Sequence, residues 1–188
     1  MIKEINGNLI KLALSGEFDV IAHGVNCFST QKSGLAPQMN KAFFTAHDEL
    51  YRLERAMYRG DINKLGQIEA NQVFVAKNKF KTIVKSVVDG GSKHFINKGY
   101  EIVVPGLSVV NCYTQFMYGK NHLDGVEAPL DYEALALCMR KINYDFRGKH
   151  IGLPLIGCGL AGGDWNKVKS IIEKELADMQ VTIVHYKK

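Results

Sequence analysis

Hydrophobic and polar residues follow one another in two different patterns along the chain, one typical of strands and one typical of helices. Short, mostly apolar runs predict strands over 19–26, 68–77, 80–88, 100–115, 150–157 and 181–186. Amphipathic stretches predict helices over 34–60 and 129–146, and Trp165, Val168, Ile172 and Leu176 recur at helical spacing. Strands therefore mix with helices throughout. This favours an α/β fold with a mixed or largely parallel central sheet covered by helices on both faces.

Length and composition fit a single soluble domain. A chain of 188 residues, 46% hydrophobic and 23% charged, favours one domain over residues 1–188 with an ordinary globular composition. No apolar run approaches the roughly 20 residues that are needed to span a bilayer. The beginning, "MIKEINGNLIKLAL", lacks the layout of a signal peptide. We therefore expect a cytoplasmic protein with no membrane contact.

Positive charge is concentrated in one segment. The formal net charge is +5, which is compatible with an anionic ligand, and residues 77–98 hold six lysines and one acidic residue. Lys77, Lys79 and Lys81 alternate, so on a strand they would share one face. That face is either a solvated edge protected against aggregation or a surface that contacts a polyanion.

The four cysteines, Cys27, Cys112, Cys138 and Cys158, form no C-x-x-C pair. Buried free thiols are therefore the main expectation. The alternative is a site that uses His23 with Cys27, Cys112 and Cys158. We expect neither a metal nor a cofactor.

Three predicted strands are followed by unusual loops: "HGVNCFSTQKSGLA" (23–36), "NCYTQFMYG" (111–119) and "GCGLAGGDW" (157–165). In open α/β sheets, ligands bind in the crevice outside the carboxyl ends of the strands. If the three loops converge there, they form one cleft.

The last of these loops is rich in glycine and opens a helix. Gly157, Gly159, Gly162 and Gly163 fall within seven positions. Glycines let the backbone approach phosphate oxygens closely, and N–H groups at a helix start favour an anion. The alternative is a tight strand–helix turn that needs its glycines for geometry alone. The pattern is neither a P-loop nor a well-placed G-x-G-x-x-G, so neither an NTPase nor a dinucleotide dehydrogenase is indicated.

Three polar residues near these loops are candidates for catalysis. Asp164 is either the N-cap of the following helix or an acid or base beside the anion. Asn26 ends an apolar strand, and its amide suits ribose hydroxyls, unless it only caps its loop. His23 is either a hydrogen-bonded core residue or a general base at the cleft.

Taken together, the motifs resemble a macrodomain, the ADP-ribose-binding α/β/α fold with a mixed central sheet. Three blocks carry the resemblance, "VIAHGVNCFSTQKSGLAPQMNKAF", "LSVVNCYTQ" and "IGLPLIGCGLAGGDWNKVKSIIEKEL", with a weaker fourth, "INGNLIKLA". Their order and spacing match the family across nearly the whole chain.

The resemblance implies an ADP-ribose site. The glycine loop Gly157–Gly162 would cradle the diphosphate, Ser33–Ala36 would close over the distal ribose, and Asn26 would hold that ribose. Asn8 stands where the family usually has an aspartate that reads the adenine amino group, and its carbonyl could still accept that hydrogen bond. The expected ligand-binding residues are Asn8, Leu9, Asn26, Ser33, Gly34, Leu35, Ala36, Thr114, Gln115, Gly157, Cys158, Gly159, Leu160, Ala161 and Gly162.

Within the family, the motifs resemble the ADP-ribose 1''-phosphate phosphatase branch. Gln115 and Ala161 replace the lysine and aspartate of the glycohydrolase type, which disfavours a lysine-adduct mechanism. We therefore expect hydrolysis of ADP-ribose 1''-phosphate, with His23, Asn26 and Asp164 as catalytic residues. The alternatives are a hydrolase that removes ADP-ribose from a modified protein or nucleic acid, and a non-catalytic ADP-ribose reader. A nucleic-acid-binding domain is disfavoured because the basic segment has few aromatic residues beyond Phe80 and Phe95.

Overall fold

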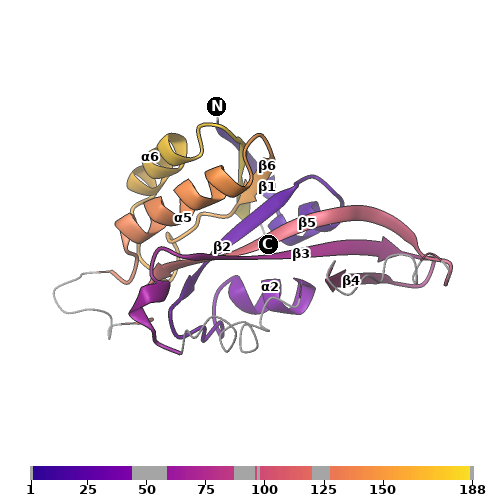
Figure 1. Ribbon diagram of the computed structural model, residues 1–188, viewed down its shortest axis with the longest axis horizontal. Helices are drawn as coiled ribbons and strands as arrows, with labels where there is room; N and C mark the ends of the chain where they lie inside the picture. Colours follow the sequence, from indigo (N-terminus) through magenta and orange to yellow (C-terminus); the bar gives the residue numbers. More distant parts are fainter. Residues whose placement is uncertain (1, 44–58, 87–95, 97, 120–127, 187–188) are drawn as a thin grey trace.

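The computed structural model describes residues 2–43, 59–86, 96, 98–119 and 128–186. Its strands form one mixed sheet in the order β1-β7-β6-β2-β5-β3-β4 (Figure 1). Neighbours from β1 to β5 pair in parallel, whereas β3 runs antiparallel to both β5 and β4. In chain order the strands are β1 (Ile2–Gly7), β2 (Val20–Asn26), β3 (Ile68–Lys77), β4 (Thr82–Ser86), β5 (Glu101–Gln115), β6 (His150–Leu153) and β7 (Gln180–Tyr186).

Helices cover both faces of the sheet. α5 and α6 lie on one face and α2 lies on the other (Figure 1). Within the described residues, no helix is both long and apolar enough to cross a membrane. The helices are α1 (Leu9–Leu14), α2 (Ala36–Phe43), α5 (Tyr132–Asp145) and α6 (Trp165–Glu175), with a short 3-10 helix, η1 (Ile62–Lys64).

Strand β2 shows why the sheet has two cores. It reads VIAHGVN and is buried along almost its whole length, as expected for a parallel strand with helices on both sides. Ala22 packs into the core under α5 and α6, while Ile21 packs into the core under α1 and α2. This alternation gives the three-layer α/β/α arrangement that the sequence predicts.

Most predicted elements agree with the structure to within a few residues, and the differences are these. β6 ends at Leu153 instead of residue 157, because Pro154 begins a turn in which its carbonyl accepts from Ile156 N at 2.7 Å. α2 begins at Ala36 and is described as far as Phe43, whereas residues 59–60, at the end of the predicted helix, form a turn. β4 begins at Thr82 instead of residue 80. Residues 44–58 and the last two residues of the predicted strand 80–88 lie outside the described residues. β1 and α1 were not predicted, because β1 is a partly exposed strand with no clear apolar run.

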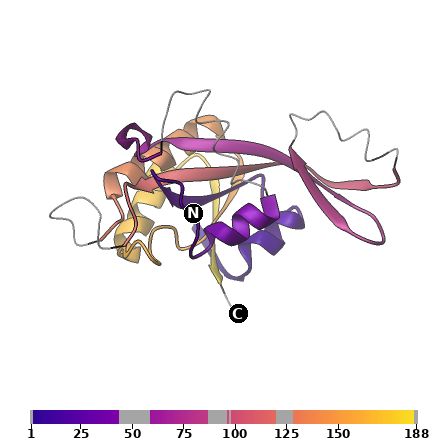
Figure 2. The ribbon, with the colours of Figure 1, turned by 90° about the horizontal axis from the view of Figure 1, so that it is seen from below.

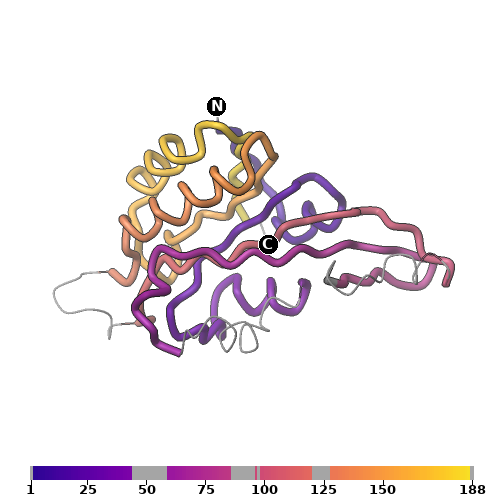
Figure 3. The backbone as a smooth tube through the Cα atoms, in the orientation of Figure 1, coloured from indigo at the N-terminus to yellow at the C-terminus, as the bar shows by residue number. Residues whose placement is uncertain are grey.

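Strands β3, β4 and β5 extend past the rest of the sheet as an arm, which consists of residues 73–86 and 98–107 (Figures 2 and 3). β2 pairs with β5 only from Ser108 onward, so the earlier part of β5 has β3 as its paired neighbour. At the tip, Asn78 N donates to Lys81 O at 3.1 Å and closes a turn between β3 and β4. The prediction that Lys77, Lys79 and Lys81 share a strand face is therefore wrong, because β3 ends at Lys77.

Candidate functional site

The three loops singled out in the sequence meet at the carboxyl ends of the parallel strands. Cys27 N, just after β2, donates to the carbonyls of Gln115 and Phe116 after β5, both at 3.1 Å. A Cβ built on Gly34 would lie 3.5 Å from Leu160 Cδ1, so the loop after β2 also contacts the glycine loop. This edge of the sheet is the candidate site.

The glycine loop folds back on itself before helix α6 begins. Gly163 N donates to Gly157 O at 2.9 Å, and Gly162 N donates to Gly159 O at 3.0 Å. Gly159 and Leu160 lie between these contacts and are exposed. In the part of the chain that the structure describes, their amides donate to no protein acceptor. Two free N–H groups that precede a helix are suited to an anion.

At three of the four glycine positions in the loop, the fold itself requires glycine. Gly157 and Gly162 have positive φ angles of 74° and 69°, a conformation that glycine adopts without strain. A Cβ on Gly163 would lie 2.2 Å from a methyl carbon of Leu130. A Cβ on Gly159 would meet nothing within 4 Å, and its φ is not in the left-handed region. The fold therefore does not require glycine at position 159.

Substitution of Gly163 by alanine is expected to destabilise the protein by about 1–3 kcal/mol. The added methyl would overlap the Leu130 side chain and would lie 2.9 Å from Gly157 O, a backbone atom that cannot rotate away. Urea unfolding of the Gly163→Ala variant measures this loss. A variant as stable as the wild type would contradict the tight packing of the loop over Leu130.

Asn26 organises the loop that follows β2. Its Oδ1 accepts from Phe28 N at 3.0 Å and from Thr30 N at 3.3 Å, while its Nδ2 donates to Thr30 Oγ1 at 2.8 Å. The side chain is largely buried. One Nδ2 hydrogen is not used in these contacts, so the loop-capping role does not exclude a hydrogen bond to a ligand.

The remaining parts of the loop after β2 and the start of α1 also line this edge. Ser33 and Gly34 are exposed, Leu35 is half-buried and Ala36 is buried at the start of α2. Asn8 caps α1 by accepting from Lys11 N at 3.1 Å.

Several predicted ligand contacts are turned away from the edge. Leu9 and Ala161 have buried side chains that pack in the two cores, so only their backbones can reach a ligand. Thr114 is fully buried, and a Cβ on Gly24 would lie 2.9 Å from its Oγ1, so Thr114 too could reach a ligand only through its backbone. Gln115 is half-buried and donates from Nε2 to Met117 O at 3.0 Å.

His23 lies inside the sheet and not at the cleft. The residue is only 2% exposed, and it pairs with Asn111 of β5. Burial lowers the pKa of His23 to about 4, and the Asn111 side chain and Gly24 backbone oppose this shift more weakly. The expectation that His23 faces the cleft is therefore not met, because three further residues of β2 separate it from the strand end.

Asp164 is the N-cap of α6. Its Oδ1 accepts from Asn166 N at 2.7 Å and from Lys167 N at 3.2 Å. Its own amide donates to the Tyr132 hydroxyl at 2.8 Å, which ties the end of the glycine loop to the start of α5. The residue is exposed and its Oδ2 makes no hydrogen bond within the described residues. The capping role is confirmed, and the catalytic role stays a prediction.

The cysteines are free, and three of them are buried. Burial raises the pKa of Cys27 to about 12, and burial together with the Asp164 carboxylate raises the pKa of the Cys158 thiol. Both are therefore thiols at neutral pH and poor nucleophiles. Among the described residues, no three His, Cys, Asp or Glu side chains lie where they could hold a metal ion, so the alternative site of His23 with three cysteines finds no support.

Two residues that support the site were not identified from the sequence. Leu130 fills the space under Gly157 and Gly163, and Tyr132 holds the Asp164 backbone. Both lie just before or at the start of α5, next to its N-cap Asp131. The segment "PLDY" shows the cap but gives no sign of its contact with a loop about 30 residues further on.

No family model matches the chain. An uncharacterized 17.5 kDa protein from the tk-vs intergenic region of Enterobacteria phage T4 is 28% identical over 191 residues, which cover 99% of this chain and 97% of the phage protein. The macrodomain of Thermus aquaticus DarG matches the structure with a TM-score of 0.59 at 19% identity, over 100% of this chain and 99% of that chain. Thermosipho africanus DarTG, solved in complex with ADP-ribose, matches with a TM-score of 0.59 at 12% identity, over 98% of this chain and 41% of that chain.

These likenesses define the class of fold: a three-layer α/β/α arrangement with a mixed sheet, shared along the whole of this chain. The protein has the macrodomain fold, as the motifs in its sequence predict.

Proposed function

We propose that the protein binds ADP-ribose at the carboxyl edge of its sheet, with the diphosphate against the glycine loop. Gly159 and Leu160 are exposed, their amides donate to no acceptor among the described residues, and they precede an 11-residue helix whose dipole favours negative charge. The macrodomain fold supports the proposal, since a protein with this fold was solved in complex with ADP-ribose.

The observation that carries the proposal is the open space beside Gly159. The other three loop glycines are needed for packing or for a positive φ, but a side chain at position 159 would meet no protein atom within 4 Å. A ligand that approaches the backbone closely is the remaining physical reason for glycine there. A diphosphate that accepts from the two free amides would occupy this space.

The other residues of the edge complete the proposed site. The unused Nδ2 hydrogen of Asn26 would bind the distal ribose, and residues 33–36 would close over that ribose next to Leu160. Asn8 caps α1 with its Oδ1 and would accept from the adenine amino group with the second lone pair of that atom. Leu9 would contribute its backbone amide.

Calorimetry with ADP-ribose tests the binding site. The Gly159→Val variant is expected to bind ADP-ribose at least tenfold more weakly, because the new side chain takes the space of the diphosphate. Its free energy of unfolding should not fall, since the position is unstrained and a side chain restricts the unfolded chain.

The matched Gly163→Ala variant should behave in the opposite way. Its free energy of unfolding should fall, because the new methyl overlaps Leu130, while its affinity for ADP-ribose should stay at the wild-type value. Equal ADP-ribose affinity in the Gly159→Val variant and the wild type would show that the loop is only a structural turn. No binding by the wild type would reject the proposed function.

Hydrolysis of ADP-ribose 1''-phosphate is the second candidate function, and it is favoured by Asp164 Oδ2, which accepts no hydrogen bond from the residues that the structure describes. Asp164 is an exposed residue that directly follows the loop that would hold the diphosphate. In the proposed reaction, a water attacks phosphorus and the bond between phosphorus and the 1'' oxygen breaks. Asp164 takes the proton of the water and returns one to the leaving oxygen, which gives ADP-ribose and phosphate.

A further inference from the structure

One segment of the sequence, most of whose lysines lie on the arm, carries a net charge equal to that of the whole protein. Residues 77–98 hold six lysines and one aspartate, which equals the formal net charge of +5 of the full chain. The rest of the sequence is therefore neutral overall. Five of these lysines are described and exposed, and none of them forms an ion pair within the described residues: Lys77, Lys79, Lys81, Lys85 and Lys98.

The tip of the arm presents an aromatic ring to solvent. Phe80 lies in the turn between β3 and β4 and is 83% exposed. Asn78 fixes this turn, because its Oδ1 accepts from Phe80 N and Lys81 N, both at 2.9 Å. The Lys79 ammonium lies 5.0 Å from the centre of the Phe80 ring. Turns are usually formed by small polar residues, so an exposed phenylalanine at this position is not explained by the fold.

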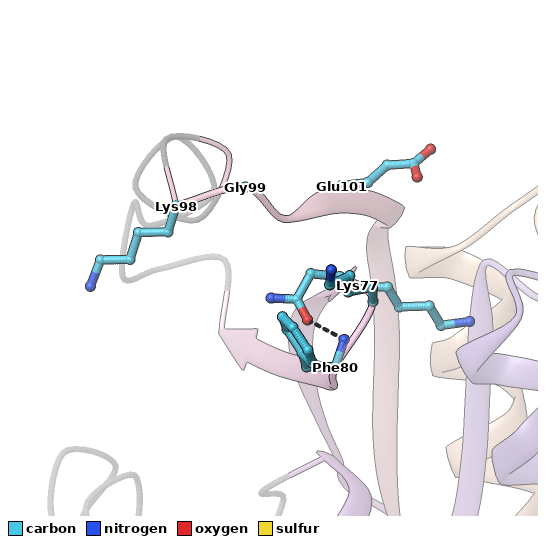
Figure 4. A pocket seen from close by; sticks show the side chains of 7 residues that line it. Lys77, Phe80, Lys98, Gly99 and Glu101 are labelled. Carbon is cyan, nitrogen blue, oxygen red and sulfur yellow. Dashed lines mark hydrogen bonds between the residues drawn. The ribbon is translucent and has the colours of Figure 1, made fainter.

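A hollow runs between this turn and residues 98–101 (Figure 4). Three lysines, Lys77, Lys79 and Lys98, line it together with the ring of Phe80. Glu101 also lines it, but its carboxylate points away from Lys77 and Lys98 in Figure 4. The tip thus combines several unpaired cations with one flat apolar surface.

We propose that the tip of the arm binds single-stranded nucleic acid. The lysines would contact backbone phosphates, and an unpaired base would stack on the open face of the Phe80 ring. The proposal goes beyond ADP-ribose binding and does not depend on it, because the arm extends away from the carboxyl edge of β2 and β6.

The combination of groups favours nucleic acid over other anionic partners. An acidic protein would use the lysines but would leave the Phe80 ring exposed. A membrane surface would need a broad apolar face, whereas the described turn offers one ring surrounded by lysines. Single-stranded nucleic acid provides both phosphates and accessible base faces at short, regular spacing.

Fluorescence anisotropy with a labelled oligothymidine tests the proposal. We expect the triple variant Lys77→Gln, Lys79→Gln, Lys98→Gln to bind at least tenfold more weakly than the wild type at low salt. The slope of log affinity against log salt should become shallower by about 2, because three phosphate contacts are lost. Phe80→Ser should weaken binding at least fivefold without changing that slope, since it removes stacking and no charge.

The matched control removes three exposed lysines outside the arm: Lys3→Gln, Lys149→Gln, Lys174→Gln. It has the same net charge as the arm variant, and we expect less than a threefold change in its affinity for the oligothymidine. Calorimetry with ADP-ribose should give the wild-type value for the arm variant, which separates this proposal from the proposed function.

Four results would overturn the proposal. The first is that the wild type does not bind the oligothymidine, and the second is that both triple variants lose the same affinity for it. The third is that duplex DNA binds as tightly as the single strand. The fourth is that polyglutamate or phosphatidylserine vesicles displace the oligothymidine at equal charge concentration. The last two would indicate an electrostatic surface that does not use the Phe80 ring.

Discussion

Replacement of Asp164 by asparagine is expected to slow phosphate release from ADP-ribose 1''-phosphate by about 100-fold, the usual contribution of a positioned general base. Asparagine keeps the carbonyl oxygen that accepts from Asn166 N and Lys167 N, and it is as good an N-cap as aspartate. The variant therefore removes the free carboxylate oxygen and keeps the start of α6. Phosphate release at saturating substrate measures the rate, and calorimetry with ADP-ribose should show unchanged affinity.

The Asp164→Ala variant is the matched comparison. It loses both the proposed base and the cap, so it should show the same loss of rate together with a free energy of unfolding lower by about 1 kcal/mol. If Asp164→Asn releases phosphate at the wild-type rate while His23→Ala does not, the buried histidine is the base and the assignment to Asp164 is wrong. A wild type that binds ADP-ribose but releases no phosphate would be a reader, or a hydrolase for a different ADP-ribose linkage.

Local sequence patterns predict the centre of this fold well. β2 lies between two strands and under helices on both faces, so burial alone determines its apolar run. The N-caps Asp131 and Asp164 follow from a local rule, because the side chain bonds to amides two or three residues further on. Such contacts within a few residues are visible in a linear sequence.

Contacts between distant segments are not visible in the same way. The reason for glycine at position 163 is the Leu130 side chain, which is 33 residues away in the sequence and reaches the loop only after α5 and the sheet have packed. The burial of His23 depends similarly on which face of β2 its side chain takes and on what covers that face. A polar residue in an apolar strand indicates neither a cleft nor a core until the neighbouring strands are placed.

The arm shows a third limit of sequence reasoning. Alternating lysines predict one face of a strand, but Asn78 accepts from two backbone amides and turns the chain at the end of β3. Asparagine favours such turns, so the signal was present in "KNKFK". The alternating pattern of the flanking residues favoured a strand instead of this turn. The consequence is functional, because the turn places Phe80 and the lysines at an exposed tip.

Acidification from pH 7 to pH 4.5 is expected to destabilise the protein by about 2–3 kcal/mol through His23 alone. Burial lowers the folded-state pKa of His23 to about 4, while the unfolded chain has the ordinary value near 6.5. Between these two values the unfolded state binds a proton that the folded state does not. The stability is therefore complete above pH 6.5 and falls as the pH drops towards 4. This loss is a large part of the 5–15 kcal/mol typical of a folded domain.

Urea unfolding of the wild type and of His23→Gln at both pH values isolates this contribution. Glutamine is neutral throughout the range, so the variant should lose about 2–3 kcal/mol less than the wild type over the same pH step, whatever its stability at pH 7. Carboxylates elsewhere titrate equally in both proteins and cancel in the comparison. An equal loss in both proteins would mean that His23 accepts a proton in the folded state. That result would contradict the burial of the ring as the main influence on the pKa of His23.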